Sequence, residues 1–309
     1  MNTGDLFGSS VAISGDGLRF VVGAPLEDTT ATTSGAAYVF TLSSDGTTVS
    51  QEALLKGVSP VLGDDFGGSV ALNQGGTTLA VGAKERGGKG EVSIFTYTGT
   101  WSTATAITGL APNATAAGDK FGASVSLSDA GTTPTLAVGA PAATSTGLVY
   151  IFTGATFGTQ QAVLTASNAG SGDQFGSSVS LSQSGDTLIV GAPEEDSNAT
   201  STCSTACSAA ESDNSATSTG AAYRFSRESG VWTQKTYIKA TNTGAGDQFG
   251  FSVAVSNNEI VTTNVSPFTQ TLVIGAPFED GSTPGVYKGS VILPPDANST
   301  DNFGAAYLH

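Results

Sequence analysis

The chain carries one motif in five copies. Each copy opens with Gly-Asp-x-Phe-Gly, continues with alternating apolar and small polar residues, and ends in an apolar run closed by Gly-Ala. The openings begin at Gly4, Gly63, Gly118, Gly172 and Gly246, so successive copies lie 59, 55, 54 and 74 residues apart. Repeats of this length made of short strands are typical of radial or stacked β architectures. The spacing therefore predicts an all-β array rather than one continuous sheet.

Each copy is expected to form four strands. In the first copy, residues 7–14 alternate between apolar and small polar side chains, as a half-buried strand does. Asp16-Gly17 is a hairpin signal, and Pro25 ends the next apolar run because it has no N–H for a strand ladder. We expect strands over residues 7–14, 18–24, 35–40 and 49–55.

The distribution of side-chain sizes favours a β-propeller. Small residues begin the first two strands, and aromatic residues (Trp101, Phe157 and Trp232) mark the fourth strands. Small inner and large outer residues suit blades that converge on a central axis. We expect a single propeller of four-stranded antiparallel blades, the last incomplete because the sequence reaches His309 on a third strand. The expected blades span about residues 4–62, 63–117, 118–171, 172–245 and 246–309.

These landmarks resemble the FG-GAP repeat, which is found in the propellers of integrin α-subunits and in many secreted bacterial proteins. The resemblance covers essentially the whole chain, and residues 232–250 are similar to blade linkers of bacterial and algal extracellular members. One family feature is missing. Integrin blades bind calcium through an Asp-x-Asp-x-Asp-Gly loop between the first two strands, whereas the corresponding loops here hold at most one carboxylate each. The resemblance therefore does not imply calcium sites in these loops.

The charge of the chain limits its partners. Eleven basic and 26 acidic residues give a net charge of −15, which disfavours nucleic acid and anionic membranes because phosphate binding needs clustered Lys and Arg. Cations and basic surfaces suit this charge better. No apolar stretch approaches the roughly 20 residues of a membrane span. The sequence around Met1 does not resemble a signal peptide, and we expect the chain to be an excerpt of a longer secreted protein.

Two features favour an extracellular location. Cys203 and Cys207 lie four residues apart in a Ser/Thr/Ala-rich segment, which suits a local disulfide in an oxidising compartment. Four Asn-x-Ser/Thr sequons are candidate glycosylation sites: Asn113, Asn198, Asn264 and Asn298.

In an antiparallel meander, the loop from the second to the third strand and the loop between blades lie on the same face. We call this the long-loop face; it also receives two long insertions, residues 197–218 and 281–302. Its acidic pairs are candidate ligands for Ca²⁺, which prefers several oxygens. The alternative is that these carboxylates are solvated or cap turns through their own backbone. The candidate metal ligands are Glu27, Asp28, Glu195, Asp196, Glu279 and Asp280.

The second copy departs from the pattern after its second strand. Where other copies read Gly-Ala-Pro, it places Lys84, Arg86 and Lys89 in a short loop. These residues are candidates for docking a carboxylate ligand or a neighbouring acidic loop. The alternative is a solvated turn.

The residues argue against catalysis. The only histidine is His309, which leaves no Ser-His-Asp or Cys-His arrangement within the repeats, and the two cysteines lack a zinc-ligand pattern. A carboxylate-pair glycosidase needs only two acids and stays open as an alternative. We expect a protein that is not an enzyme and has no cofactor apart from the candidate Ca²⁺.

Because loops on a rigid scaffold commonly carry binding, we expect a non-catalytic recognition or adhesion module that binds a protein or glycan through the long-loop face. The main alternative is a structural subunit of an extracellular filament or coat. In that interpretation the unpaired edge of the last blade pairs with a neighbouring copy.

Overall fold

The computed structural model describes residues 3–28, 33–101, 116–129, 133–200, 202–203, 213–256, 270–280, 285–288 and 304–309. In these residues the regular structure is all β, apart from two short 3-10 turns, η1 (Arg86–Gly88) and η2 (Ala143–Ser145). The chain divides into two compact units: Met1–Thr144 with Val149–Val163, and Ser145–Leu148 with Leu164–His309. The assignment of all five blades to a single domain stays a prediction.

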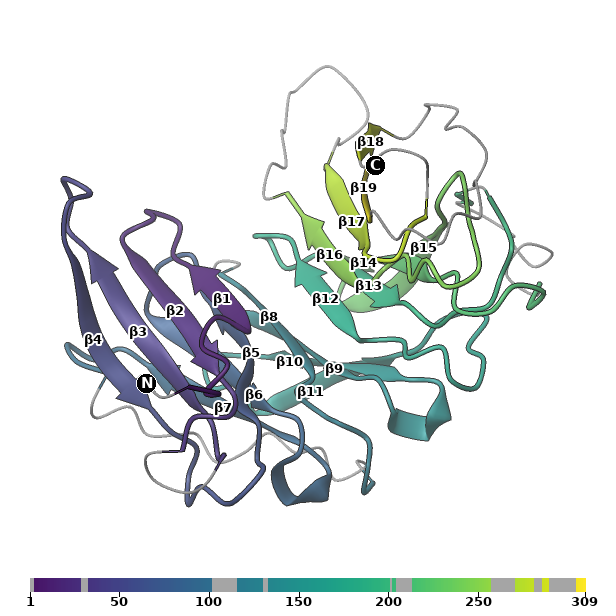
Figure 1. The fold of residues 1–309 in the computed structure, drawn as a ribbon. Helices are drawn as coiled ribbons and strands as arrows, with labels where there is room; N and C mark the ends of the chain where they lie inside the picture. Colours follow the sequence, from purple (N-terminus) through teal and green to yellow (C-terminus); the bar gives the residue numbers. More distant parts are fainter. Residues whose placement is uncertain are drawn as a thin grey trace. The chain divides into compact units, whose positions relative to one another are not determined.

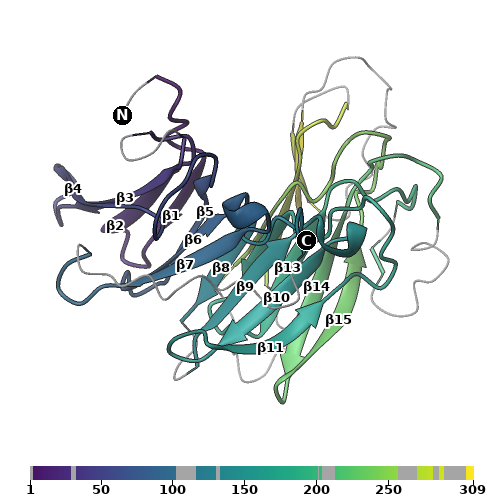
Figure 2. The same ribbon diagram turned by 90° about the horizontal axis from the view of Figure 1, so that it is seen from below.

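The first unit holds blades 1 and 2 and most of blade 3. Blade 1 contains β1 (Ser10–Ile13), β2 (Arg19–Ala24), β3 (Ala36–Leu42) and β4 (Val49–Leu55). Blade 2 contains β5 (Phe66–Leu72), β6 (Thr78–Ala83) and β7 (Glu91–Thr96); its expected fourth strand lies outside the described residues. Blade 3 contains β8 (Ser124–Ser128), β9 (Thr135–Ala140), β10 (Leu148–Thr153) and β11 (Thr159–Leu164). In each blade the strands are hydrogen-bonded in sequence order. Figure 1 shows β1 to β4 as neighbouring arrows, and Figure 2 shows β9, β10 and β11 side by side.

The second unit holds blades 4 and 5. Blade 4 contains β12 (Ser178–Leu181), β13 (Thr187–Ala192), β14 (Ala221–Glu228) and β15 (Val231–Ile238). Blade 5 contains β16 (Ser252–Val255), β17 (Leu272–Ala276), β18 (Gly285–Lys288) and β19 (Ala305–Leu308). Within blade 5 the spatial order is β16-β17-β19-β18, so the sheet order departs from the chain order at this point alone among the described sheets.

The second strands form the blade interiors because their sequences are apolar runs rather than alternations. β9 (TLAVGA) and β13 (TLIVGA) are buried along their whole lengths. The first strands of blades 1 and 4, β1 and β12, alternate in burial from residue to residue, whereas β4 changes from exposed at Val49 to buried at Leu55. Continuous apolar runs are typical of strands covered on both sides. The expected strands are confirmed in blade 1, where β4 has the predicted bounds and β2 and β3 differ by one or two residues at their ends.

The Phe-Gly landmarks form the joints between consecutive blades. The phenylalanine of one repeat pairs with a glycine that precedes the third strand of the repeat before it. A Cβ on that glycine would lie 2.0–2.1 Å from the phenylalanine carbonyl oxygen, so no larger residue fits. Each of these glycines also has a positive φ, which glycine adopts without steric cost. The described pairs are Gly35↔Phe66, Gly90↔Phe121 and Gly220↔Phe249.

Blade 5 has the expected three antiparallel strands, but the edge of the third is paired. β16, β17 and β19 run antiparallel to their neighbours, and β18 lies parallel to β19, with Tyr287 opposite Tyr307. β18 comes from the insertion between β17 and β19, where the sequence predicted only a loop. The prediction that the last strand, β19, has an unpaired edge is therefore wrong. A four-residue segment enclosed in a long polar insertion had no alternation by which to recognise it.

Candidate functional site

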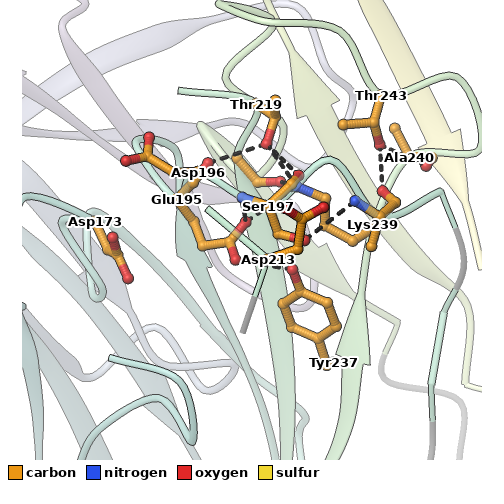
Figure 3. A network of polar contacts seen from close by, with 12 residues as sticks. Asp173, Glu195, Asp196, Ser197, Asp213, Thr219, Tyr237, Lys239, Ala240 and Thr243 are labelled. Carbon is orange, nitrogen blue, oxygen red and sulfur yellow. Dashed lines mark hydrogen bonds and ion pairs between the residues drawn. The ribbon is translucent and has the colours of Figure 1, made fainter. Parts of the chain in front are cut away.

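The long insertion of blade 4 rests on a buried ion pair between Glu195 and Lys239 (Figure 3). Glu195 follows β13 after a tight turn, and Lys239 follows β15 directly. The side chains are 1% and 0% exposed, and Lys239 Nζ lies 3.0 Å from Glu195 Oε2. The two connections thus meet on one face, as predicted for the loops of an antiparallel meander.

Every proton of the Lys239 ammonium group has an acceptor. Besides Glu195, Nζ donates to Thr219 Oγ1 and to the Gly220 carbonyl oxygen, both at 2.7 Å. An ammonium group has three N–H donors, so the three contacts use its full capacity. Burial lowers the pKa of Lys239, and the neighbouring Glu195 carboxylate opposes that shift.

The Glu195 carboxylate is equally well supplied with donors. Tyr237 OH and Asn168 Nδ2 donate to Oε1 at 2.8 and 2.9 Å, while the Ser197 N–H and Lys239 donate to Oε2. Four donors to its two oxygens hold this buried carboxylate in one position. We call Glu195, Lys239, Thr219, Tyr237 and Asn168 the blade-4 hub. Its lysine is held by acceptors on all sides, so the hub has a supporting role rather than that of a nucleophile or proton carrier.

The blade-4 hub anchors both ends of the insertion. At the start, Cys203 and Tyr237 exchange two backbone hydrogen bonds of 2.9 Å, and Thr243 Oγ1 donates to the Ala199 carbonyl at 2.8 Å. At the end, the Ser218 N–H donates to Asp196 Oδ1 at 2.9 Å. Near its stems the insertion is therefore tied to β15 and to the linker that leads to blade 5.

Blade 1 contains the same arrangement on a smaller scale. Lys56 forms an ion pair with the buried Glu27 and donates to the Gly35 carbonyl oxygen at 3.0 Å. The sequence positions are equivalent: each glutamate lies four residues after the second-strand glycine, and each lysine lies eight residues before the next Gly-Asp aspartate. In blade 3, Ala143 and Thr165 occupy these positions, so acid and base are absent together. This paired occurrence was the sequence signal for the hub, and neither lysine was predicted to belong to a site.

The six predicted metal ligands lie in different surroundings. Glu27 and Glu195 are paired with lysines, Asp28 is exposed, and Asp196 accepts the Ser218 N–H. Glu279 is buried and accepts hydrogen bonds from Tyr307 OH and Asn242 Nδ2, each at 2.8 Å. Among the described residues, Glu279 and Asp280 group with Asp247, and one ligand atom from each lies within 4.8 Å of the others. Calcium binding stays a prediction, and this group is where it is best placed.

If calcium binds this group, it will raise the thermal unfolding midpoint, because a ligand that binds only the folded state stabilises it by about 2.7 kcal/mol at 100 times its Kd. Asp247→Asn combined with Glu279→Gln will abolish the increase. Scanning calorimetry with calcium and with chelator measures the effect, and Asp45→Asn, in an exposed turn, is the control. Equal midpoints under both conditions would exclude the site.

The basic loop of blade 2 contacts the acidic opening of its own repeat. Lys84 Nζ lies 2.8 Å from Asp65 Oδ2, and Arg86 Nη1 lies 2.5 Å from Asp64 Oδ2. Arg86 also donates to the carbonyl oxygens of residues 58 and 59. Of the three candidate ligand residues, Lys89 is the most exposed. Lys84 and Arg86 therefore contact an acidic loop. Binding of a carboxylate ligand by the basic loop stays a prediction.

The remaining predicted modification sites are described only in part. Asn198 is exposed at the start of the insertion, whereas Asn113, Asn264 and Asn298 lie outside the described residues. Cys207 also lies outside them, so the disulfide with Cys203 stays a prediction. Within the described part of the chain, no helix has the length and apolar character needed to cross a bilayer.

Successive sheets of three or four strands, antiparallel except for β18 and joined through Phe-Gly contacts, define a β-propeller. Comparison with known families agrees: residues 1–40, 159–205 and 232–293 match the FG-GAP repeat. The chain is an FG-GAP repeat β-propeller. None of the curated proteins matches it significantly.

Solved structures resemble the chain at low sequence identity. Sqt1 of Chaetomium thermophilum, bound to the N-terminus of the ribosomal protein L10, is 14% identical with a TM-score of 0.50, over 84% of this chain and 54% of that one. A putative 6-phosphogluconolactonase of Bacteroides fragilis is 16% identical with a TM-score of 0.47, over 76% and 55%. The chain spans about half the length of these proteins. At 14% identity, the likeness to Sqt1 concerns the fold alone.

Proposed function

We propose that this protein is a non-catalytic extracellular recognition module that binds a protein or glycan through its long-loop face. The observation that carries the proposal is the blade-4 hub, which fixes both stems of a long insertion to the β scaffold. Rigid scaffolds that present loops in this way commonly carry binding. A loop whose stems are already ordered loses less conformational entropy when a ligand binds.

The charge of the chain narrows the ligand class. With a net charge of −15, the long-loop face suits a basic protein surface or an uncharged glycan better than an acidic polysaccharide. The structural-subunit alternative depended on an unpaired edge at β19, and that edge is paired with β18.

The proposal predicts that binding is lost when the insertion is removed. In the test variant, Gly-Asn-Gly replaces residues 198–217, leaving Ser197 and Ser218 in place. In the control variant, Asn-Gly replaces residues 183–186, a loop at the opposite end of blade 4. Biolayer interferometry against immobilised neutral glycans and basic proteins measures affinity, and calorimetry checks that both variants fold.

We expect at least one probe to bind the unmodified protein and the control equally, and to bind the insertion variant at least ten-fold more weakly. Recovery of the bound glycan unchanged is expected of a module without catalysis. Equal binding by the insertion variant, or no binding to any probe, would contradict the proposal.

A further inference from the structure

The linker between blades 1 and 2 differs in sequence from the other three blade linkers. Counting back from the Gly-Asp aspartate, Val58, Val61 and Leu62 are its sixth, third and second residues. These side chains are 45–71% exposed, so they do not belong to the core. The other linkers place only small or polar residues at these positions: Asn113, Ala116 and Ala117; Ser167, Gly170 and Ser171; Thr241, Gly244 and Ala245. The apolar side chains are therefore not a requirement of joining two blades.

The guanidinium group of Arg86 holds this linker in place. It donates to the Val58 and Ser59 carbonyl oxygens at 2.6 and 2.9 Å. It also donates to Asp64 Oδ2, which in turn accepts the Val61 N–H at 2.8 Å. The backbone that carries the exposed apolar side chains is thus fixed before a partner arrives, and an ordered surface loses less conformational entropy on binding.

Blade 2 reverses a charge to make this contact. Arg86 is the fourth residue after the second-strand glycine, where three other blades have a buried glutamate: Glu27, Glu195 and Glu279. In blades 1 and 4 that glutamate pairs with a lysine that follows the fourth strand of the same blade. Arg86 instead contacts the linker that precedes its own repeat. The departure at position 86 therefore accompanies the departure of the linker itself.

Two lysines beside this contact have no carboxylate partner. Seven basic residues of the chain form ion pairs, whereas Lys89 and Lys120 are exposed and form none with the described residues. Lys89 comes directly after η1, which begins with Arg86. Its carbonyl oxygen accepts the Phe121 N–H at 2.9 Å, which brings the segment that carries Lys120 next to it. We call Val58, Val61, Leu62, Lys89 and Lys120 the first-linker patch.

The acidic residues around the first-linker patch leave its lysines available. Asp64 and Glu91 lie against Arg86, and Asp65 pairs with Lys84. Between residues 58 and 91, Glu85 is the one acidic residue classed as exposed. All these residues belong to the first compact unit, so the patch is defined within that unit alone.

We propose that the first-linker patch binds a peptide segment of a partner protein in which acidic residues stand beside large apolar residues. Its apolar side chains pack on the exposed valines and leucine, and its carboxylates contact Lys89 and Lys120. Exposed apolar side chains gathered on an ordered loop mark interaction sites, and complementary charge gives such a site its specificity.

An acidic peptide suits the patch although the chain as a whole carries a net charge of −15. Charges further away than about 8 Å are largely screened at physiological ionic strength, so the nearby lysines dominate for a short peptide. An anionic membrane is a poorer occupant, because its extended negative surface also meets the acidic remainder of the protein. The blade-4 insertion takes no part in the patch, and the inference goes beyond the proposed function.

Two double variants test the two halves of the patch. Val61→Ala with Leu62→Ala gives the linker the Ala-Ala pair of residues 116–117. Lys89→Gln with Lys120→Gln removes both charges, and glutamine already occupies the position of Lys120 in blades 4 and 5 with the same positive φ. The matched controls are Val49→Ala with Leu54→Ala, both exposed on β4, and Lys235→Gln at an exposed lysine.

Phage-displayed random peptides selected on the unmodified protein supply the probes, and fluorescence polarisation measures the affinity of each enriched peptide. We expect a group of enriched peptides with Asp or Glu beside large apolar residues. These peptides should bind the controls as they bind the unmodified protein, bind each test variant at least ten-fold more weakly, and bind more weakly at high salt. Calorimetry checks that all variants fold. The variant without the blade-4 insertion should keep this binding, so failure of the proposed function and failure of this inference are distinguishable.

Several results would overturn the inference. One is that no enriched peptide loses affinity for both test variants, and another is that the peptides that lose it lack acidic residues. Sedimentation with phosphatidylserine vesicles and light scattering over a concentration series examine other occupants. Vesicle binding or self-association that Val61→Ala with Leu62→Ala abolishes would assign the patch to a membrane or to a second copy of the chain instead.

Discussion

Replacing Lys239 with methionine will lower the free energy of unfolding by about 3–5 kcal/mol, the usual cost of removing one partner from a buried ion pair. Methionine fills a similar volume but leaves the Glu195 carboxylate, which is 1% exposed, without its counter-charge. The Thr219 hydroxyl and the Gly220 carbonyl also lose a donor. Urea denaturation followed by circular dichroism measures the loss.

The matched control for this experiment is Lys235→Met in the same segment. Lys235 Nζ lies 2.8 Å from Glu228 Oε1, but the two side chains are 36% and 71% exposed, and water screens such pairs. We expect its midpoint to stay close to that of the unmodified protein. Adding Glu195→Gln to Lys239→Met should recover part of the loss, because the unpaired charge is then gone. A Lys239→Met variant as stable as the control would show that the hub does not hold blade 4 together.

Replacing Phe249 with alanine will also destabilise the protein by about 3–5 kcal/mol, as expected when a buried aromatic side chain is truncated. Phe249 is fully buried, and its ring meets Tyr307 edge-to-face with 5.1 Å between centroids. Its backbone pairs with Gly220 at the joint of blades 4 and 5. The cavity thus forms where two blades meet, and we expect a lower urea midpoint.

Phe251 supplies the control for Phe249, two residues further along the same segment. Its side chain is 54% exposed, so Phe251→Ala should change stability by less than about 1 kcal/mol, as is usual for surface positions. Similar losses for the two variants would contradict the assignment of the Phe-Gly landmark to the blade joint. A large loss for Phe249→Ala alone would support it.

The strands were predictable because their signals are local. Alternation of apolar and small residues, Asp-Gly turns and Pro after the second strand all act within a few residues. The predicted limits of β4, and the expectation that the sequence reaches His309 on a third strand, are accordingly close to what the structure shows. β18 was not predicted because its pairing depends on β19, which follows only after the remainder of a long insertion.

Only the acidic residues of the candidate site were predictable from the sequence. Glutamates after the second strand stand out in a chain with few charges, and their place on the long-loop face follows from the alternation of an antiparallel meander. Their partners do not stand out: Lys239 contacts a carboxylate 44 residues earlier, and Lys56 precedes the linker to the next blade. A conspicuous acidic pair therefore suggested a metal, whereas in blades 1 and 4 the structure supplies a lysine.

The amino-acid sequence by itself determined the repeat, the all-β class, the order of strands within most blades and the glycine–phenylalanine landmarks, because each depends on neighbouring residues and backbone conformation. Only the tertiary structure decided which buried acids are paired with a lysine and which strand covers β19. Those outcomes depend on which side chains and strands meet although they are tens of residues apart in the sequence.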